Sequence, residues 1–423
     1  MSSPSRSLSY LAVLSFPSAG RAFSAALLGR LSYGTVFLSL TLALATATGS
    51  YALAGAIIAM ERLTNSLLSP MRAALIDRYG PHRTLPPMTV LYALLLLCLT
   101  VLTWRPGTSG GVLAALAIAA GGCAPPLGPV MRTLWSDLLP DRQMLHRAYS
   151  LDTVAEELIF IAGPLLAGLL AALTNPAAGV ALSAALITLG VFAFVSSPAV
   201  RSARPTQTDI ATGAAPQTEP GTDSALTAPR QRWTHDMGAL ILPVAASVAI
   251  GLCLGALSLL MVVFAERHHQ TAAVAWAQAA LSAGSALGGL AYGAISWRIS
   301  GKTRLAVLAI ALSLALAGAG VSPNLYILVV LAGITGLFVA PTLSTTYLLA
   351  DEFAKPQHRT QAGAWVNTAF NTGDSVGTAA IGLVVDSLSL ALCFLLAAIP
   401  TLLTGLMAVG PTRNRQDLWI KKS

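Results

Sequence analysis

The chain has 423 residues, of which 55% are hydrophobic and only 10% charged, and its mean hydropathy is +0.70. A soluble chain of this length would carry about a quarter charged residues to cover its surface. The composition therefore excludes a soluble globular protein. The formal net charge is +8, but the basic residues lie in short loops between apolar segments rather than in the clusters that bind nucleic acid. We expect a lipid bilayer, and no nucleic acid, as the chain's environment.

Twelve apolar segments follow one another along the chain, each about twenty residues long, which is the length that crosses a ~30 Å hydrocarbon layer as a helix. They predict an all-α integral membrane protein with 12 transmembrane helices. In chain order the predicted spans are Phe23–Ala45, Tyr51–Leu68, Thr84–Thr103, Gly111–Met131, Thr153–Leu173, Ala177–Val195, Met237–Phe264, Thr271–Ser296, Leu305–Val321, Tyr326–Leu349, Gly363–Val385 and Leu388–Val409.

The segment between the sixth and seventh spans, residues 199–235, is rich in Thr, Ala and Pro and has few large apolar residues. Such a composition cannot bury a core, and it predicts a disordered cytoplasmic linker. The linker divides the chain into an N-terminal six-helix bundle, residues 1–198, and a C-terminal six-helix bundle with a short cytoplasmic tail, residues 236–423.

The basic residues predict the orientation of the chain in the membrane. With both termini in the cytoplasm, only Arg105 and Arg267 of the 25 basic residues face outward, and Arg30 and Arg62 lie within spans. Basic loops stay preferentially on the cytoplasmic side of a membrane. The abundant Ala, Gly and Arg are typical of a GC-rich bacterium, so we expect a multi-pass protein of the bacterial inner membrane.

The sequence has no pattern typical of an enzyme or a metal site. Cys98, Cys123, Cys253 and Cys393 all lie within apolar segments, where cysteine behaves as a small apolar residue. No nucleotide-binding loop or metal-ligand spacing is present. We therefore predict no enzymatic activity, no metal and no cofactor.

The two halves carry an internal repeat. A shift of 216 residues (340 − 124) aligns Ala124-Pro125 with Ala340-Pro341 and Tyr149 with Trp365. Two related six-helix bundles place a binding site between the halves, near the middle of the bilayer.

The loop after the second span resembles a signature of the major facilitator superfamily of secondary transporters, G-x-x-x-D-R/K-x-G-x-R/K-R/K. Here it runs from Ala73 to Arg83 as AALIDRYGPHR, with Ala73 in place of the first glycine and His82 in place of one basic residue. The resemblance covers nearly the whole chain. It implies two pseudo-symmetric bundles, alternating access and, by analogy alone, a monomer.

Within this loop, Asp77 is expected to pair with Arg78 or Arg83, or to cap the N-terminus of a neighbouring helix. Gly80 permits a tight turn. The loop then acts as a latch for one conformation of the transporter. The alternative is an ordinary cytoplasmic loop with a basic charge.

The fifth span contains Gly163, Pro164 and Gly168, which resemble an element typical of proton-coupled antiporters in this superfamily. Ala167 replaces one glycine of that element, and Ile159 stands where another glycine is expected. The alternative is plain close packing of helices around the Gly-Pro pair.

Ionisable residues within the spans are the main functional candidates, because each costs roughly 2.5–3.5 kcal/mol at mid-helix when it is unpaired. Counting depth along each span places Arg30 near Glu156 and Glu157, of which only one can face it, and the i, i+4 spacing of Asp152 and Glu156 favours Glu156. It also places Asp374 on one face with two asparagines. Permanent ion pairs, Arg30–Glu156 and Glu61–Arg62, and interhelical hydrogen bonds are the alternatives to a transport role. Arg132, Arg142 and Arg147 are assigned to topology. The proton-coupling candidates are Glu61, Glu156, Glu157 and Asp374, and the cavity or substrate candidates are Arg30, Tyr33, Asn367 and Asn371.

The predicted function is proton-coupled export, as an antiporter, of a small and largely apolar organic molecule such as a drug or secondary metabolite. The cavity helices one, four, seven and ten are weakly polar apart from Arg30, and this favours such a cargo. The alternatives are a proton symporter for uptake of a small nutrient and a transporter-like receptor that moves no cargo.

Overall fold

The computed structural model describes residues 10–105, 107–139, 141–202, 231–268 and 273–409, and within these ranges it contains helices and no strands. The N-terminal half consists of α1 (Tyr10–Leu14), α2 (Ala19–Thr48), α3 (Tyr51–Tyr79), α4 (Pro81–Thr103), α5 (Gly110–Cys123), α6 (Leu127–Leu138), α7 (Arg142–Leu173), α8 (Pro176–Ser196) and α9 (Pro198–Ser202). The C-terminal half consists of α10 (Gln231–Arg267), α11 (Ala273–Ala294), α12 (Gly301–Ala319), α13 (Leu325–Phe353), η2 (Pro356–His358), α14 (Arg359–Val384) and α15 (Leu390–Val409).

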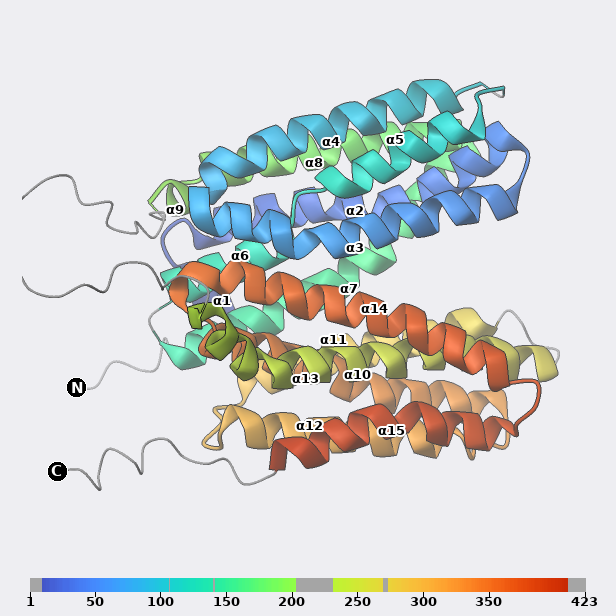
Figure 1. The fold of residues 1–423 in the computed structure, drawn as a ribbon. Coiled ribbons are helices and arrows are strands. Elements are labelled where there is room, and N and C mark those ends of the chain that lie inside the picture. Colours follow the sequence, from blue (N-terminus) through green and yellow to red (C-terminus); the bar gives the residue numbers. More distant parts are fainter. Residues whose placement is uncertain (1–9, 106, 140, 203–230, 269–272, 410–423) are drawn as a thin grey trace, which may run out of the picture.

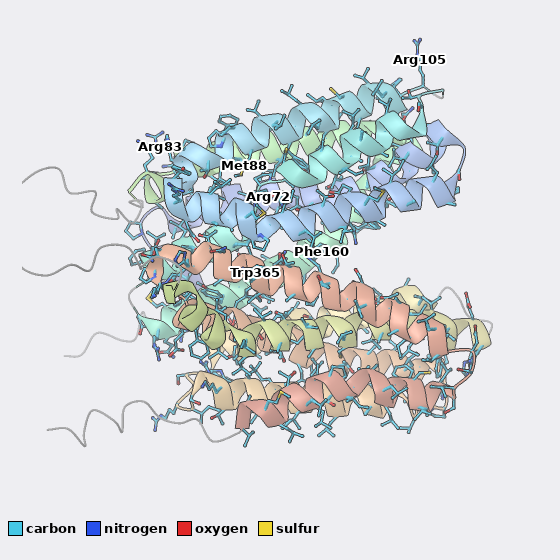
Figure 2. All side chains as sticks on the ribbon, in the orientation of Figure 1. Arg72, Arg83, Met88, Arg105, Phe160 and Trp365 are labelled. Carbon is cyan, nitrogen blue, oxygen red and sulfur yellow. The ribbon has the colours of Figure 1, made fainter. Side chains whose placement is uncertain are left out.

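The two halves are bundles that lie side by side, with their long helices running in roughly the same direction (Figure 1). We call the end of the molecule that carries α1 and α9 the α9 end, and the opposite end the far end. Arg83 lies at the α9 end and Arg105 at the far end (Figure 2).

Nine helical segments in the described residues are long and apolar enough to cross a membrane, with α5 and α6 together forming one of them. The other three predicted spans correspond to α3, α11 and α14, which do not meet that combined criterion of length, hydropathy and charge. All three nevertheless pack lengthwise against long neighbours, α3 against α5, α11 against α13, and α14 against α10. The all-α membrane fold is thereby established.

The fourth predicted span, Gly111–Met131, consists of two helices, α5 and α6, with a break between them. The cause is the pair Pro125-Pro126 between α5 and α6, because proline has no N–H to continue the helical hydrogen bonds. Arg72 donates to the Gly121 carbonyl over 2.7 Å, and the Tyr33 hydroxyl donates to the Pro125 carbonyl. Arg72 thus supplies the donor that Pro125 cannot offer to the Gly121 carbonyl, and Tyr33 adds a second donor to the Pro125 carbonyl, which also accepts from the Leu127 N–H. The repeat counterpart, Pro341, lies inside the uninterrupted helix α13.

The ends of the predicted linker are helical. Residues 198–202 form α9, in which Ala199 and Val200 are buried against the N-terminal half. Helix α10 already begins at residue 231. The apolar pair Ala199-Val200 explains why the N-terminal end is ordered against the bundle. The remainder of the predicted linker, residues 203–230, lies outside the described residues.

The halves meet mainly through α3 with α14 and α7 with α11. Glycines of α11 allow a close approach to α7: a Cβ on Gly289 would lie 2.7 Å from Val154, and one on Gly293 would lie 2.7 Å from Ser150. Among the described residues, the hydrogen bonds between the halves run from Arg142–Glu352 at the α9 end to Ser285–Glu157. The halves are therefore closed together at the α9 end.

Candidate transport site

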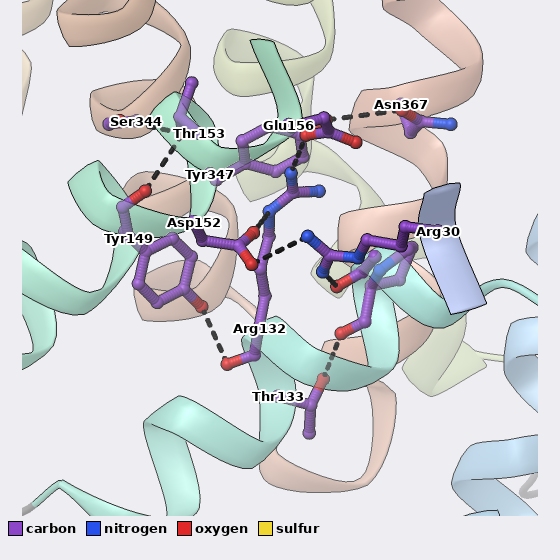
Figure 3. Close-up of polar contacts among 12 residues, drawn as sticks. Arg30, Arg132, Thr133, Tyr149, Asp152, Thr153, Glu156, Ser344, Tyr347 and Asn367 are labelled. Atoms are coloured by element: carbon purple, nitrogen blue, oxygen red, sulfur yellow. Dashed lines mark hydrogen bonds and ion pairs between the residues drawn. The ribbon is translucent and has the colours of Figure 1, made fainter. Parts of the chain in front are cut away.

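Four charged side chains of the N-terminal half form one buried cluster (Figure 3). Arg30 of α2 places Nη1 2.8 Å from Oδ1 of Asp152 on α7. Arg132 of α6 reaches both acidic residues, with Nε 2.9 Å from Oδ2 of Asp152 and Nη2 2.5 Å from Oε2 of Glu156. Two arginines thus face two carboxylates, and their formal charges cancel.

Burial distinguishes the two carboxylates. The side chain of Asp152 is 0% exposed and each of its two arginine partners is 3% exposed, whereas the side chain of Glu156 is 28% exposed. Asp152 is therefore the fixed centre of the cluster, because losing its charge would leave buried Arg30 without an ion pair and Arg132 with Glu156 alone. Glu156 is the member that solvent or a ligand can reach.

The structure corrects two predictions about these residues. Arg30 pairs with Asp152 and not with Glu156, and Arg132, assigned to topology, is a central member of the cluster. Depth along a helix did not reveal the direction of each side chain. Arg132 follows the break between α5 and α6, which orients α6 independently of α5. Asp152 and Glu156 do share one face of α7, as their i, i+4 spacing predicts.

The cluster also contacts the C-terminal half. The Cζ atom of Arg132 lies 3.7 Å from the centre of the Tyr347 ring on α13, a cation–π contact. The Tyr347 hydroxyl donates to Oδ1 of Asn367 on α14 over 3.4 Å, so this predicted cavity residue borders the cluster (Figure 3). Tyr347 lies in an apolar span without any distinguishing pattern, and sequence reasoning missed it.

Glu157 points to a different partner from its neighbour Glu156. The hydroxyl of Ser285 on α11 donates to its Oε1 over 3.0 Å. Glu157 therefore belongs to the contact between α7 and α11, and this hydrogen bond joins it to the opposite half. Consecutive residues on a helix point about 100° apart, and the two glutamates follow this rule.

The other predicted proton and cavity residues lie apart from the cluster. Within the described part of the chain, no ion pair joins Glu61 to Arg62, whose guanidinium stacks 3.8 Å from the centre of the Phe37 ring. Asp374 lies on α14 against Gly255 of α10, where an added Cβ would lie 1.9 Å from the Asp374 carbonyl oxygen. Asn371 is exposed, and within the described ranges no side-chain hydrogen bond joins it to the cluster. Tyr33 supports the break in the fourth span through its bond to the Pro125 carbonyl.

The loop after α3 joins the two halves through Asp77. Of the three predicted partners, Arg78, Arg83 and a helix N-terminus, the structure shows the helix N-terminus. Asp77 caps the N-terminus of α14, accepting from the Thr360 N–H over 3.2 Å and from the Gln361 N–H over 2.9 Å. Burial raises the pKa of Asp77 to about 6, although these hydrogen bonds lower it. Gly80 has φ of 82°, the left-handed turn that glycine permits. Arg78 stacks on Tyr79, 5.2 Å from the ring centre.

The Gly163-Pro164 element lies where α7 crosses α2. A Cβ on Gly163 would lie 2.3 Å from the carbonyl carbon of Gly34, so the two backbones touch here. A Cβ on Gly168 would meet nothing within 4 Å. Gly163 thus serves close packing, and Gly168 does not.

A helical membrane protein of two bundles, with a buried charge cluster contacting both halves, is the architecture of a secondary transporter. The family profile described as "Major Facilitator Superfamily" matches residues 22–318 and 244–422. The chain belongs to the Major Facilitator Superfamily of transporters.

Relatives and solved structures agree with this assignment. The chain is 24% identical to the multidrug efflux pump Tap of Mycobacterium tuberculosis (strain H37Rv) over 351 residues, which are 81% of each chain. Among solved structures, an outward-facing bacterial homologue of the iron transporter ferroportin superposes with a TM-score of 0.71 at 13% identity, covering 93% of this chain and 98% of that one. The human organic anion transporter MFSD10 (TETRAN) superposes with a TM-score of 0.63 at 17% identity, covering 92% and 98%. At these identities the structures show the shared fold alone.

Proposed function

We propose that the chain is a proton-coupled antiporter that exports a small, largely apolar organic molecule by alternating access. The proposal rests on the position of Glu156. Its side chain is the solvent-exposed end of a buried, charge-balanced cluster that contacts both halves of the protein. A carboxylate in this position changes the charge of the cluster when it binds or releases a proton.

The coupling follows from the contacts of Arg132. In the conformation closed at the α9 end, ionised Glu156 holds Arg132 beside Tyr347 of the other half. A proton on Glu156 removes one of the two carboxylate charges that attract the guanidinium and leaves the cluster with a net positive charge. The contact between the halves then depends on the protonation of one residue. Such differential binding is what couples a proton to a conformational change.

Three further observations support export of an apolar cargo. The relative Tap is a multidrug efflux pump, and it is similar to this chain over 81% of the length of each. The helices that face the other half near the cluster offer hydroxyl groups and aromatic rings, with few charges outside the cluster. The distribution of basic loops supports an inner-membrane orientation with both termini in the cytoplasm, and the α9 end is then the cytoplasmic end.

The experiment uses inside-out membrane vesicles with an acid interior, a pH-sensitive dye and a panel of lipophilic compounds. Antiport predicts that adding a transported compound drives protons out of the vesicles, and that vesicles without the protein show no such efflux. Proton movement into the acid lumen together with the compound would indicate symport instead. The absence of any compound-dependent proton movement, with folded protein present in the membrane, would contradict proton coupling.

A further inference from the structure

Gly128, the second residue of α6, has surroundings unlike those of the glycines that hold the N-terminal half together. A Cβ on Gly34, Gly163 or Gly190 would lie 2.7, 2.3 or 2.2 Å from a backbone atom of a neighbouring helix. A Cβ on Gly128 would meet no atom closer than 3.5 Å, which is an ordinary contact distance. Packing therefore does not require glycine here, although glycine is disfavoured within helices.

The atoms around this space are the charged ends of the cluster. From the Cβ position on Gly128, Nη1 of Arg132 lies at 3.5 Å, Nη2 of Arg30 at 3.8 Å and Oε1 of Glu156 at 3.9 Å. Arg132 is 2% exposed, and among the described residues its Nη1 has no hydrogen-bond partner. A buried donor without an acceptor is costly. The donor therefore points to an oxygen that the chain itself does not supply.

The start of α6 adds to the attraction for an oxygen. Pro126 is its N-cap and makes no side-chain capping bond. The Leu127 N–H donates to the Pro125 carbonyl, the Val130 N–H donates to the Pro126 carbonyl, and Pro129 has no N–H, so the Gly128 N–H remains as the donor of the first turn. Helix N-termini carry a partial positive charge. The space beside Gly128 thus combines a buried donor without an acceptor, Nη1 of Arg132, with one acceptor, Oε1 of Glu156.

A hydroxyl group matches this combination, because its oxygen accepts from Arg132 while its hydrogen is donated to Glu156. A carboxylate would satisfy Arg132 but be repelled by Glu156, and an ammonium group would be repelled by Arg132 and Arg30. A carbonyl oxygen would leave Oε1 of Glu156 without a donor. Glu156, with 28% of its side chain exposed, marks the side from which such a group enters.

We propose that the space beside Gly128 is a subsite for a hydroxyl group of the transported molecule, so that the cargo is an apolar alcohol or phenol. The inference rests on the proposed transport function and specifies its substrate class. The hydroxyl hydrogen of the cargo and a proton compete for the same carboxylate of Glu156. Cargo and proton then oppose each other at one residue, which is the relation that antiport requires.

The test compares equilibrium binding of two probes to the purified full chain in detergent, 2-naphthol and its methyl ether 2-methoxynaphthalene. The wild type should bind 2-naphthol at least tenfold more tightly, and only the naphthol affinity should fall on acidification as Glu156 takes up a proton. Gly128→Ala should bind both probes equally, because its methyl group occupies the subsite. Gly168→Ala, whose Cβ also meets no close atom, is the matched control and should keep the preference.

Equal affinity of the wild type for the two probes, or a preference retained in Gly128→Ala, would overturn the proposal. The pH dependence of the wild type gives a second readout that holds even if Gly128→Ala fails to fold. The wild type could bind the two probes equally while Gly128→Ala changes the pH dependence of binding by the same amount for both probes. That result would assign the space to a water molecule and overturn the cargo subsite. A clear hydroxyl preference without proton movement in vesicles would instead contradict antiport and leave the subsite standing.

Discussion

Arg132 of α6 stacks on Tyr347 of α13, with 3.7 Å between the guanidinium carbon and the ring centre, and the two residues belong to opposite halves of the protein. The same guanidinium pairs with Asp152 and Glu156 on α7. One side chain therefore connects the charges of the N-terminal half with the surface of the C-terminal half. A change in the charge of Asp152 or Glu156 therefore alters the contact between Arg132 and Tyr347, where the two halves meet.

Asp152 is expected to be essential for stability. Asp152→Asn leaves Arg30 and Arg132 without their fully buried carboxylate, and removing one partner of a buried ion pair costs roughly 3–5 kcal/mol. Thermal unfolding of the purified protein in detergent should show a much lower melting temperature for this variant than for the wild type. Glu352→Gln, which breaks the exposed pair with Arg142, is the control and should cost at most ~1 kcal/mol. Equal melting temperatures for the two variants would contradict a structural role for Asp152.

Gly163 is expected to be required for the crossing of α2 and α7. Gly163→Ala places a methyl group 2.3 Å from the Gly34 carbonyl carbon, and neither backbone can yield without separating the helices. Overpacking of this kind costs roughly 1–3 kcal/mol or more. Gly168→Ala, on the same helix, should melt like the wild type. A Gly163→Ala protein as stable as Gly168→Ala would show that α2 and α7 separate freely.

Asp77 predicts that acid favours the conformation closed at the α9 end. Its pKa is about 6 in this conformation, because burial penalises the charge, and it should return toward its ordinary value of 3.8 when the end opens to water. Between these values the closed conformation binds more protons, so lowering the pH from 7 to 5 stabilises it relative to the open one. Above pH 6 the contribution vanishes, since both conformations are then ionised.

Spin labels on two exposed positions of the α9 end, His82 in the N-terminal half and Thr303 in the C-terminal half, measure this shift. Their separation should decrease as the pH falls through 6. Asp77→Asn should reduce the response, and Glu266→Gln, an exposed carboxylate on α10 near the far end, should not. An Asp77→Asn protein with the full wild-type response would remove Asp77 from the latch.

The sequence predicted the helical membrane fold and the contact of Asp77 with a helix N-terminus, because hydropathy and loop motifs depend on local residue types. It did not predict the partner of Arg30, because counting residues gives depth along a helix but not the rotation of each helix. Arg132 was misassigned for a related reason. It follows the apolar span Gly111–Met131, and the hydropathy of that span does not show that Pro125-Pro126 break the helix. Tyr347 could not be found, since a single tyrosine in an apolar helix carries no signal of its contacts.

The most direct test of the central claim measures compound-driven proton efflux from inside-out vesicles that contain Glu156→Gln. Glutamine keeps the size of the side chain and can still accept a hydrogen bond from Arg132, but it cannot carry a proton. With Glu352→Gln as the matched control, we predict that Glu156→Gln abolishes proton efflux while the folded protein remains in the membrane, and that the control retains it. Wild-type proton efflux in Glu156→Gln would contradict the account, because the cluster would then not carry the coupled proton.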